Sequence, residues 1–305
     1  MRLGIFLPNV GSWAGPDALS RVASRAEEIG LDSVWTTERL LVAVHPTAPY
    51  PGGDGTIPDV YKTDLDPLDS LTFVAAQTSR IGLGTSVLNL PWYNPALLAR
   101  RLSTIDVLSN GRLRVGFGIG WSTDEYQAVG SDWHTRGKRS TEALEALKTI
   151  WTTDPVEFKG EFFTIPRSTI GPKPVQKPHP PIYMAAYTPS ALERVARYSD
   201  GWHPAGIPPA AVGQMFEGIK AQAQEAGRDP SELELVMRGN VEVTDELLGD
   251  DRGPFTGTTE QISADIAATK EIGASQLIFD PTFDATVTSV DDYIARIELC
   301  ADLAK

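Results

Sequence analysis

The chain is poor in the residues that cross-link proteins or bind metals, with one cysteine and four histidines among 305 residues. A single cysteine cannot form an internal disulfide bond. Cys300 lies among Ile294, Ile297 and Leu303 at helical spacing, so we expect a core residue rather than a reactive thiol. The histidines form no His-Glu-x-x-His motif and no tight cluster. We therefore expect no metal site.

Long apolar runs and an excess of positive charge are also missing. No window approaches the roughly 18 apolar residues of a membrane span, and the first residues lack the apolar core and cleavage site of a secretory signal. Lys and Arg number 27 against 40 for Asp and Glu, a formal net charge of −13, which disfavours binding to a phosphate backbone. We expect a cytoplasmic protein that binds a small molecule and neither nucleic acid nor membrane.

Short apolar runs alternate with longer segments of helical periodicity along the whole chain. Strands that are nearly continuous in apolar residues, each followed by a helix, indicate a parallel sheet buried on both faces. Eight such units favour a (β/α)₈ barrel, an α/β fold, over an open doubly wound sheet of about five or six strands. The predicted strands are Leu3–Pro8, Ser33–Glu38, Ile81–Leu88, Leu113–Gly118, Ile182–Ala186, Gly201–His203, Leu233–Val243 and Gln276–Asp280, and the clearest helices are Ala18–Ile29, Pro95–Leu108, Ser140–Trp151, Ala191–Tyr198 and Asp291–Leu303.

Three insertions account for the length beyond the roughly 250 residues of a minimal barrel. Residues 39–69 are rich in proline and glycine and follow a strand, so we expect them at the carboxyl ends of the strands as a lid over the site. Residues 154–181 predict a hairpin with its turn at Lys159-Gly160, followed by a proline-rich return. The third insertion covers 244–258. We therefore expect one barrel domain, 1–305.

Two carboxylates and a glycine-rich strand end are the candidate features for a site. Glu38 and Glu125 fall where carboxyl-end loops begin, and two carboxylates facing one cavity could hydrolyse a glycoside. Glu125 is nevertheless favoured as a solvated residue of a first helical turn. The run Gly116–Gly120 lacks the dinucleotide-binding spacing. Its glycines either let a flat ligand approach the backbone or relieve packing.

A helix start follows the fifth predicted strand. Thr188 is a suitable N-cap residue and Pro189 a suitable first helical residue. A helix N-terminus at the carboxyl face of a barrel favours a phosphate, although ordinary capping would produce the same pattern. No Gly-x-Ser-x-Gly sequence supports a serine hydrolase.

Several sequence segments, given at the end of this paragraph, together resemble the bacterial luciferase-like monooxygenase superfamily. Within it they resemble the actinobacterial branch of oxidoreductases that use the deazaflavin coenzyme F420. The resemblance covers essentially the whole chain, in order. It is specific for the superfamily, less so for the cofactor, and does not identify the substrate. It rests on LGIFLPN, LDSVWTTERL, RIGLGTSVLNLPWYNPALLARRLSTIDVLSNGRLRVGFGIGWSTDEYQAVG, GEFFTIP, PKPVQKPHPPIYMAA and ALERVARYSDGWHP.

The resemblance implies a (β/α)₈ barrel that holds a flavin or deazaflavin at the carboxyl ends of its strands. In that family the third strand ends in a non-prolyl cis peptide bond behind the ring, which corresponds here to Ser86-Val87. The implied ring contacts are Thr37, Glu38, Gly118 to Trp121 and Glu125, and the implied phosphate contacts are Ala185, Ala186, Tyr187 and Thr188.

The chain departs from the family pattern at two points. Many relatives have Asp-His after the second strand where this chain has Glu38-Arg39, so the histidine base of the sugar-phosphate dehydrogenases is missing. Where the phosphate loop commonly reads Gly-Gly, this chain has Ala185-Ala186, which keeps the backbone donors but leaves less room.

The predicted function is hydride transfer between F420 and a small apolar or aromatic organic substrate, with Glu38 and His45 as the candidate proton donors. The resemblance also implies a homodimer. Three alternatives stay open at this point. They are an FMN-dependent monooxygenase, a flavin- or deazaflavin-binding protein without catalysis, and a glycosidase.

Overall fold

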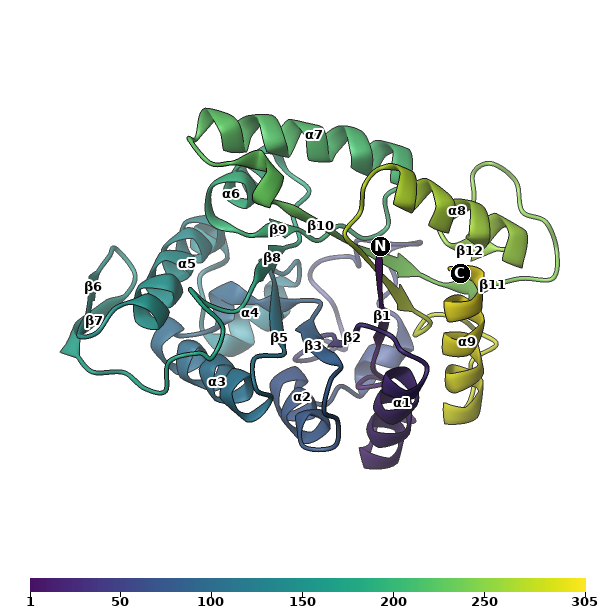
Figure 1. Cartoon of the computed structure of the whole chain (residues 1–305), viewed down its shortest axis with the longest axis horizontal. Helices are drawn as coiled ribbons and strands as arrows, with labels where there is room; N and C mark the ends of the chain where they lie inside the picture. The colour runs from purple at the N-terminus through teal and green to yellow at the C-terminus, as the bar shows by residue number, and fades with distance from the viewer.

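The computed structural model describes residues 1–305, and its parallel strands form a closed ring inside a layer of helices (Figure 1). The strand order is β3-β2-β1-β13-β10-β9-β8-β5-β4, and a further pairing of β3 with β5 closes the ring. β4 continues the line of β3 after a break, so the ring has eight positions and the predicted (β/α)₈ barrel is confirmed. The strands are β1 (Arg2–Phe6), β2 (Ser33–Thr36), β3 (Gly82–Thr85), β4 (Leu88–Asn89), β5 (Leu113–Gly118), β8 (Ile182–Met184), β9 (Gly201–Trp202), β10 (Glu234–Asn240) and β13 (Gln276–Asp280).

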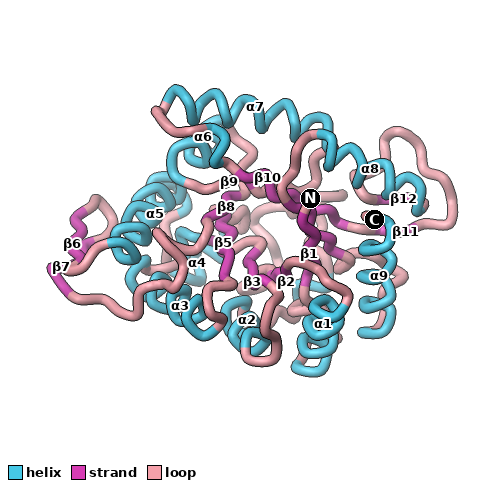
Figure 2. The backbone as a smooth tube through the Cα atoms, in the orientation of Figure 1, coloured by secondary structure: helices cyan, strands magenta, loops and turns pink.

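Helices alternate with the barrel strands and cover their outer side (Figure 2). α3 (Pro95–Leu108) illustrates how the sequence starts these helices. The side chain of Asn94 accepts hydrogen bonds from the amides of Ala96 and Leu97, and Pro95 follows Asn94 as the first helical residue. A short extra helix, α4 (Thr123–Val129), follows β5 at the site end of the barrel. The others are α1 (Pro16–Glu28), α2 (Pro67–Ala75), α3 (Pro95–Leu108), α5 (Arg136–Thr152), α6 (Pro189–Tyr198), α7 (Pro209–Glu225), α8 (Thr259–Glu271) and α9 (Val290–Leu303), with single-turn helices at Asp59–Lys62, Leu90–Trp92, Trp133–Thr135 and Pro230–Glu232.

Two separate apolar clusters explain why the strands are nearly continuous in apolar residues. The large one, 58 residues, includes inward residues of the helices and Cys300, which is 1% exposed as predicted. The small one consists of strand residues, and Gly84 makes room for its largest member, since a Cβ atom there would lie 2.3 Å from the ring of Trp35. The small cluster comprises Phe6, Trp35, Tyr183, Val236 and Ile278.

The first insertion contains little regular structure and is held at the barrel's carboxyl end by polar contacts. Between β2 and α2 only the single turn Asp59–Lys62 is helical. The amide of Thr47 donates to Asp124 on α4 at 3.0 Å, and Val10 pairs with Asp64 as an isolated bridge. α2 begins at Pro67, two residues before the predicted end of the insertion.

The second insertion forms the predicted antiparallel hairpin, β6 (Val156–Lys159) with β7 (Thr164–Ser168). Since it follows helix α5 and precedes strand β8, it belongs to the end of the barrel opposite the first insertion, and it projects from the α5 side in Figure 2. Glu142 of α5 fastens its turn by accepting hydrogen bonds from three consecutive amides, Glu161 to Phe163, at 2.7 to 3.1 Å.

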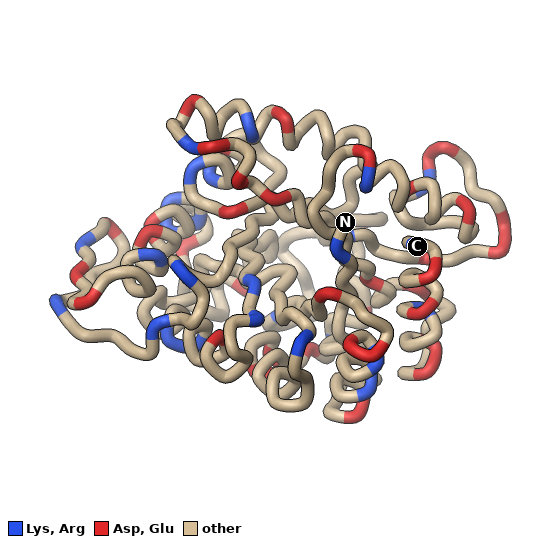
Figure 3. The backbone as a smooth tube through the Cα atoms, viewed as in Figure 1, with Lys and Arg blue, Asp and Glu red and all other residues tan.

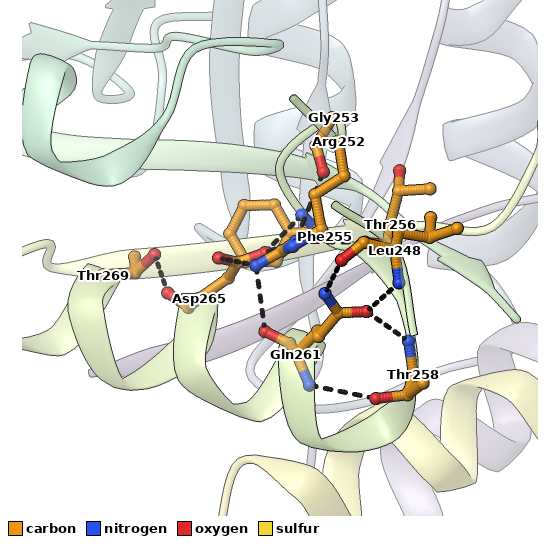
Figure 4. Close-up of polar contacts among 9 residues, drawn as sticks. All are labelled: Leu248, Arg252, Gly253, Phe255, Thr256, Thr258, Gln261, Asp265 and Thr269. Atoms are coloured by element: carbon orange, nitrogen blue, oxygen red, sulfur yellow. Dashed lines mark hydrogen bonds and ion pairs between the residues drawn. The ribbon is translucent and has the colours of Figure 1, made fainter. Parts of the chain in front are cut away.

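The third insertion, 244–258, lies between β11 (Glu242–Val243) and α8 and contains β12 (Thr256–Gly257), which pairs in parallel with β11. Figure 4 shows the hydrogen bonds and the ion pair that hold the end of this insertion against α8. Arg252 donates to both carboxylate oxygens of Asp265 at 2.6 and 2.8 Å, and the amide of Phe255 donates to the same carboxylate at 2.7 Å. A reciprocal capping box between Thr258 and Gln261 starts α8 beside it.

Figure 3 shows Lys and Arg residues interspersed with Asp and Glu residues over the outer helices and loops. None of the helices combines the length and the apolar character that crossing a membrane would demand.

Candidate functional site

A cavity of about 580 Å³ opens at the carboxyl ends of the barrel strands, where the first insertion borders it. Its volume lies within the range of small-molecule sites. Its wall comes from the ends of β4, β5 and β10, from residues that follow β2, β3, β5, β8 and β9, and from the first insertion. The residues predicted for the site that line it are Thr37, Glu38, Ser86, Val87, Gly118, Trp121, Ala185 and Tyr187.

A bulge between β3 and β4 forms one wall of this cavity. The Ser86-Val87 peptide bond is cis, as the resemblance implies. Glycines on the neighbouring strand β5 accommodate it. A Cβ atom at Gly118 would lie 2.6 Å from Cγ2 of Val87, and one at Gly116 would lie 2.1 Å from the carbonyl oxygen of Thr85. The glycines of this strand therefore serve packing, and Gly118 also leaves the backbone open to the cavity.

A buried histidine fixes the hydroxyl group of the bulge. Nδ1 of His203 lies 2.6 Å from the carbonyl oxygen of Val236, and Nε2 lies 2.7 Å from Oγ of Ser86. A carbonyl only accepts, so Nδ1 carries the proton and the Ser86 hydroxyl donates to Nε2. Burial lowers the pKa of His203 to about 4, so the ring is neutral at pH 7. His203 lines the cavity and stacks on Trp35.

Glu38 is a buried carboxyl group at the edge of the cavity. Its Oε2 accepts hydrogen bonds from the amide and the side chain of Asn89 at 2.6 and 3.1 Å, and its Oε1 accepts one from the hydroxyl of Tyr93. Burial raises the pKa of Glu38 to about 7, although these hydrogen bonds favour the carboxylate. Glu38 can therefore gain or lose a proton near neutral pH.

A second acidic side chain, Asp64, lies behind Glu38. It accepts hydrogen bonds from the amide of Arg39 and, at 2.9 Å, from the side chain of Asn9. Burial and the nearby charge of Glu38 raise the pKa of Asp64 to about 8. Asn9 also donates to the carbonyl of Thr37 at 3.0 Å, so it links the end of β1 to the end of β2. Sequence reasoning gave no role to Asn9 or Asp64, which are 55 positions apart.

The expectation that Glu125 is a solvated helix residue is wrong. Glu125 is fully buried, because the first turn of α4 faces the start of the first insertion. It forms an ion pair with Arg39 at 3.1 Å and accepts a hydrogen bond from the amide of Leu40 at 2.8 Å. Burial raises the pKa of Glu125, against the favourable charge of Arg39. The Arg39 guanidinium lies 5.0 Å from the ring centre of Trp121.

Four predicted site residues lie outside the cavity wall. Glu125 reaches it only through Arg39, and Ala186 is buried beneath it, where its carbonyl accepts a hydrogen bond from Trp202. Thr188 stands at the N-cap position of α6, but its side chain makes no capping hydrogen bond. His45 is exposed in the first insertion.

Several wall residues were not predicted from the sequence, among them Asn89, Tyr50, Tyr61, Arg238 and Asn240. A signal existed for the last two, since they are polar residues at alternate positions of an otherwise apolar strand and must face one side of it. The tyrosines lie in an insertion without periodicity, so the sequence contains no comparable signal for them.

Comparisons with known proteins agree with this geometry. The family model described as luciferase-like monooxygenase matches residues 1–248. An F420-dependent glucose-6-phosphate dehydrogenase of Amycolatopsis mediterranei is 34% identical over 192 residues, 62% of this chain and 53% of the relative. An FMNH₂-dependent dimethylsulfone monooxygenase of Pseudomonas putida is 37% identical over 153 residues, 49% of this chain and 40% of the relative. These two matches span 53% and 40% of the relatives' own lengths.

A solved structure extends the similarity to the whole barrel. An F420-dependent secondary alcohol dehydrogenase, solved with an F420-acetone adduct, superposes with a TM-score of 0.78 over 98% of both chains at 21% identity. At this identity the likeness concerns the fold. The family model, which matches most of the chain, carries the assignment: this protein belongs to the luciferase-like monooxygenase family.

Proposed function

We propose that this protein is an oxidoreductase that binds the deazaflavin F420 at the carboxyl ends of its barrel strands and transfers a hydride to or from a small apolar or aromatic substrate. The bound coenzyme would supply the hydride chemistry, since no protein side chain carries out such a transfer. The observation that carries this function is the 580 Å³ cavity with the Ser86-Val87 bulge on one wall and side-chain-free Gly118 beside it.

The residues of this wall fit a flat, tricyclic ring. Val87 offers an apolar surface, and a Cβ atom at Gly118 would collide with Val87, so only glycine keeps both the bulge and the open backbone. We propose that Thr37, Ser86, Val87, Gly118 and Trp121 contact the ring. Glu38 would contact it as well, and Glu125 would act through Arg39, while Ala185, Ala186, Tyr187 and Thr188 would hold the phosphate at the start of α6.

Glu38 is the proton donor and acceptor that the geometry supports best. It borders the cavity, its pKa lies at about 7, and Asn89 and Tyr93 hold its carboxyl group in place. His45, the other candidate, is exposed and could act only if the first insertion moved it toward the cavity. The burial of Glu38 would also keep water from its carboxyl group.

An FMN-dependent monooxygenase is the second candidate, because a relative with that described activity matches 49% of the chain. The same wall would accept an isoalloxazine ring. A flavin- or deazaflavin-binding protein without catalysis is the third candidate function.

We also propose that the protein is a homodimer, which light scattering of the purified protein would test.

Turnover with each reduced cofactor separates these functions. Reduced F420 and reduced FMN are mixed separately with the protein and a panel of aromatic ketones, enones and nitroarenes, with and without oxygen. Substrate-dependent oxidation of F420 without oxygen is the expected result. Formation of an oxygenated substrate product that requires both reduced FMN and oxygen would favour the monooxygenase, because oxygen oxidises free reduced FMN even without substrate. Binding without turnover on any substrate would contradict both enzymes.

A further inference from the structure

The end of strand β10 provides a polar part of the cavity wall that the proposed proton chemistry does not use. Arg238 and Asn240 are two residues apart on this strand and both line the cavity. The guanidinium carbon of Arg238 lies 4.3 Å from the ring centre of Phe6, and Nη2 pairs with the buried carboxylate of Asp280. Arg238 is therefore fixed by Phe6 and Asp280 and has little freedom to turn away.

The hydrogen bonds of these two side chains leave only donors facing the cavity. Nε of Arg238 donates to Oδ1 of Asn240 at 3.0 Å, which sets the orientation of the amide because a guanidinium has no acceptor. The Nδ2 group of Asn240 has no hydrogen-bond partner within the protein. Nη1 of Arg238 has one distant contact, 3.5 Å from the carbonyl oxygen of Ser86. Free N–H groups of both side chains thus remain.

We propose that Arg238 and Asn240 form a donor subsite that binds the carbonyl or carboxylate oxygen of the organic substrate. This inference rests on the proposed function, since it names a feature of the substrate for the same cavity. Asp280 offsets the charge of Arg238, so the subsite suits an acceptor with no charge or a single negative charge.

The surrounding side chains select the rest of such a substrate. Tyr50 lies edge-on to Trp121 with ring centres 5.5 Å apart, and Tyr61 lies 6.0 Å from Tyr50. All three rings line the cavity. A substrate whose aromatic ring packs against these three rings and whose acyl oxygen accepts from the donor subsite would match both the apolar and the polar part of the cavity wall.

The oxygen bound at the donor subsite could belong to the coenzyme ring instead of the substrate, because Nη1 of Arg238 approaches the bulge at Ser86. The variant Asn240→Asp distinguishes a substrate oxygen from a coenzyme oxygen. Aspartate has the same size and keeps an acceptor for Nε of Arg238, but it replaces the free amide donors by a carboxylate oxygen. Asn94→Asp is the matched control, since Asn94 is the exposed N-cap of α3 and aspartate caps equally well.

Benzoate and acetophenone serve as probes, with benzylamine as a probe of opposite polarity. Each is titrated by calorimetry into the full chain, alone and saturated with F420 or FMN. We expect benzoate and acetophenone to bind the loaded protein better than benzylamine. Asn240→Asp should weaken benzoate at least tenfold while changing the Kd of the cofactor less than twofold. Asn94→Asp should change neither.

Three results would overturn the donor subsite as a substrate site. The first is equal benzoate affinity in Asn240→Asp and the control. The second is that neither acyl probe binds the unaltered protein. The third is that the cofactor displaces benzoate and also binds Asn240→Asp more weakly than the unaltered protein. If neither cofactor binds but benzoate still depends on Asn240, the proposed function fails and the subsite stands. Asn240→Ser repeats the test without added charge if aspartate disturbs folding.

Discussion

At the scale of single residues, Glu38 connects the chemistry of the site to the stability of the fold. A carboxyl group whose pKa is about 7 in the folded protein, against about 4.5 unfolded, binds its proton more tightly in the folded state. Its stabilising contribution is therefore complete below about pH 4.5 and is lost as the pH rises through 7. The difference corresponds to about 3 kcal/mol.

Glu38→Gln should remove this dependence. Glutamine can accept from Asn89 through its oxygen and donate to the hydroxyl of Tyr93, so the fold should persist. We expect the unfolding free energy of the unaltered protein to fall by about 3 kcal/mol more between pH 4.5 and pH 8 than that of the variant. Chemical denaturation at both pH values measures it, with Glu157→Gln, exposed on the hairpin, as the control.

The same variant tests the proton role. If Glu38 exchanges a proton during turnover, Glu38→Gln should lower kcat at least a hundredfold and abolish the limb of the pH profile near 7. An unchanged profile would assign the proton transfer to another group.

The residue contacts of the site are the part that sequence reasoning recovered least. Glu125 and Arg39 are 86 positions apart, and nothing in the helical pattern around Glu125 indicates that a loop covers it. Of the residues placed by resemblance, Ser86, Val87 and Gly118 line the cavity together, whereas Ala186 and Thr188 do not. Contacts between distant segments depend on how an irregular loop folds back, which local periodicity does not encode.

At the scale of elements, every predicted barrel strand is present, because each is an apolar run bounded by turn residues. The third is split in two by the bulge after Thr85, which the apolar pattern of Ile81–Leu88 does not reveal. The first turn of helix α4 was expected at Glu125, but the extent of this seven-residue helix was not predicted, since so short a segment shows no clear helical period.

The anchor of the third insertion gives a prediction for an element. Asp265→Asn removes the ion pair to Arg252 and one acceptor, in a site where both side chains are mostly buried. We expect a loss of about 2 kcal/mol in unfolding free energy and faster proteolytic cleavage within residues 244–258. Asp251→Asn, exposed in the same loop, should leave both unchanged. Equal cleavage of the two variants would show that the anchor does not restrain the loop.

At the scale of the whole molecule, the chain length and the number of strands predicted the barrel, and the sequence segments similar to known proteins predicted the family. Neither identifies the coenzyme, because relatives described as F420-dependent and FMNH₂-dependent match the same chain. The barrel supplies a common frame, while the ligand is selected by the cavity wall.

Direct titration of the purified protein with F420 and with FMN tests the central claim. We expect stoichiometric binding of F420. Ala185→Leu, which narrows the cavity at the proposed phosphate loop, should weaken this binding at least tenfold, and Ala221→Leu on the exposed side of α7 should leave it unchanged. Failure of the unaltered protein to bind either F420 or FMN would contradict it.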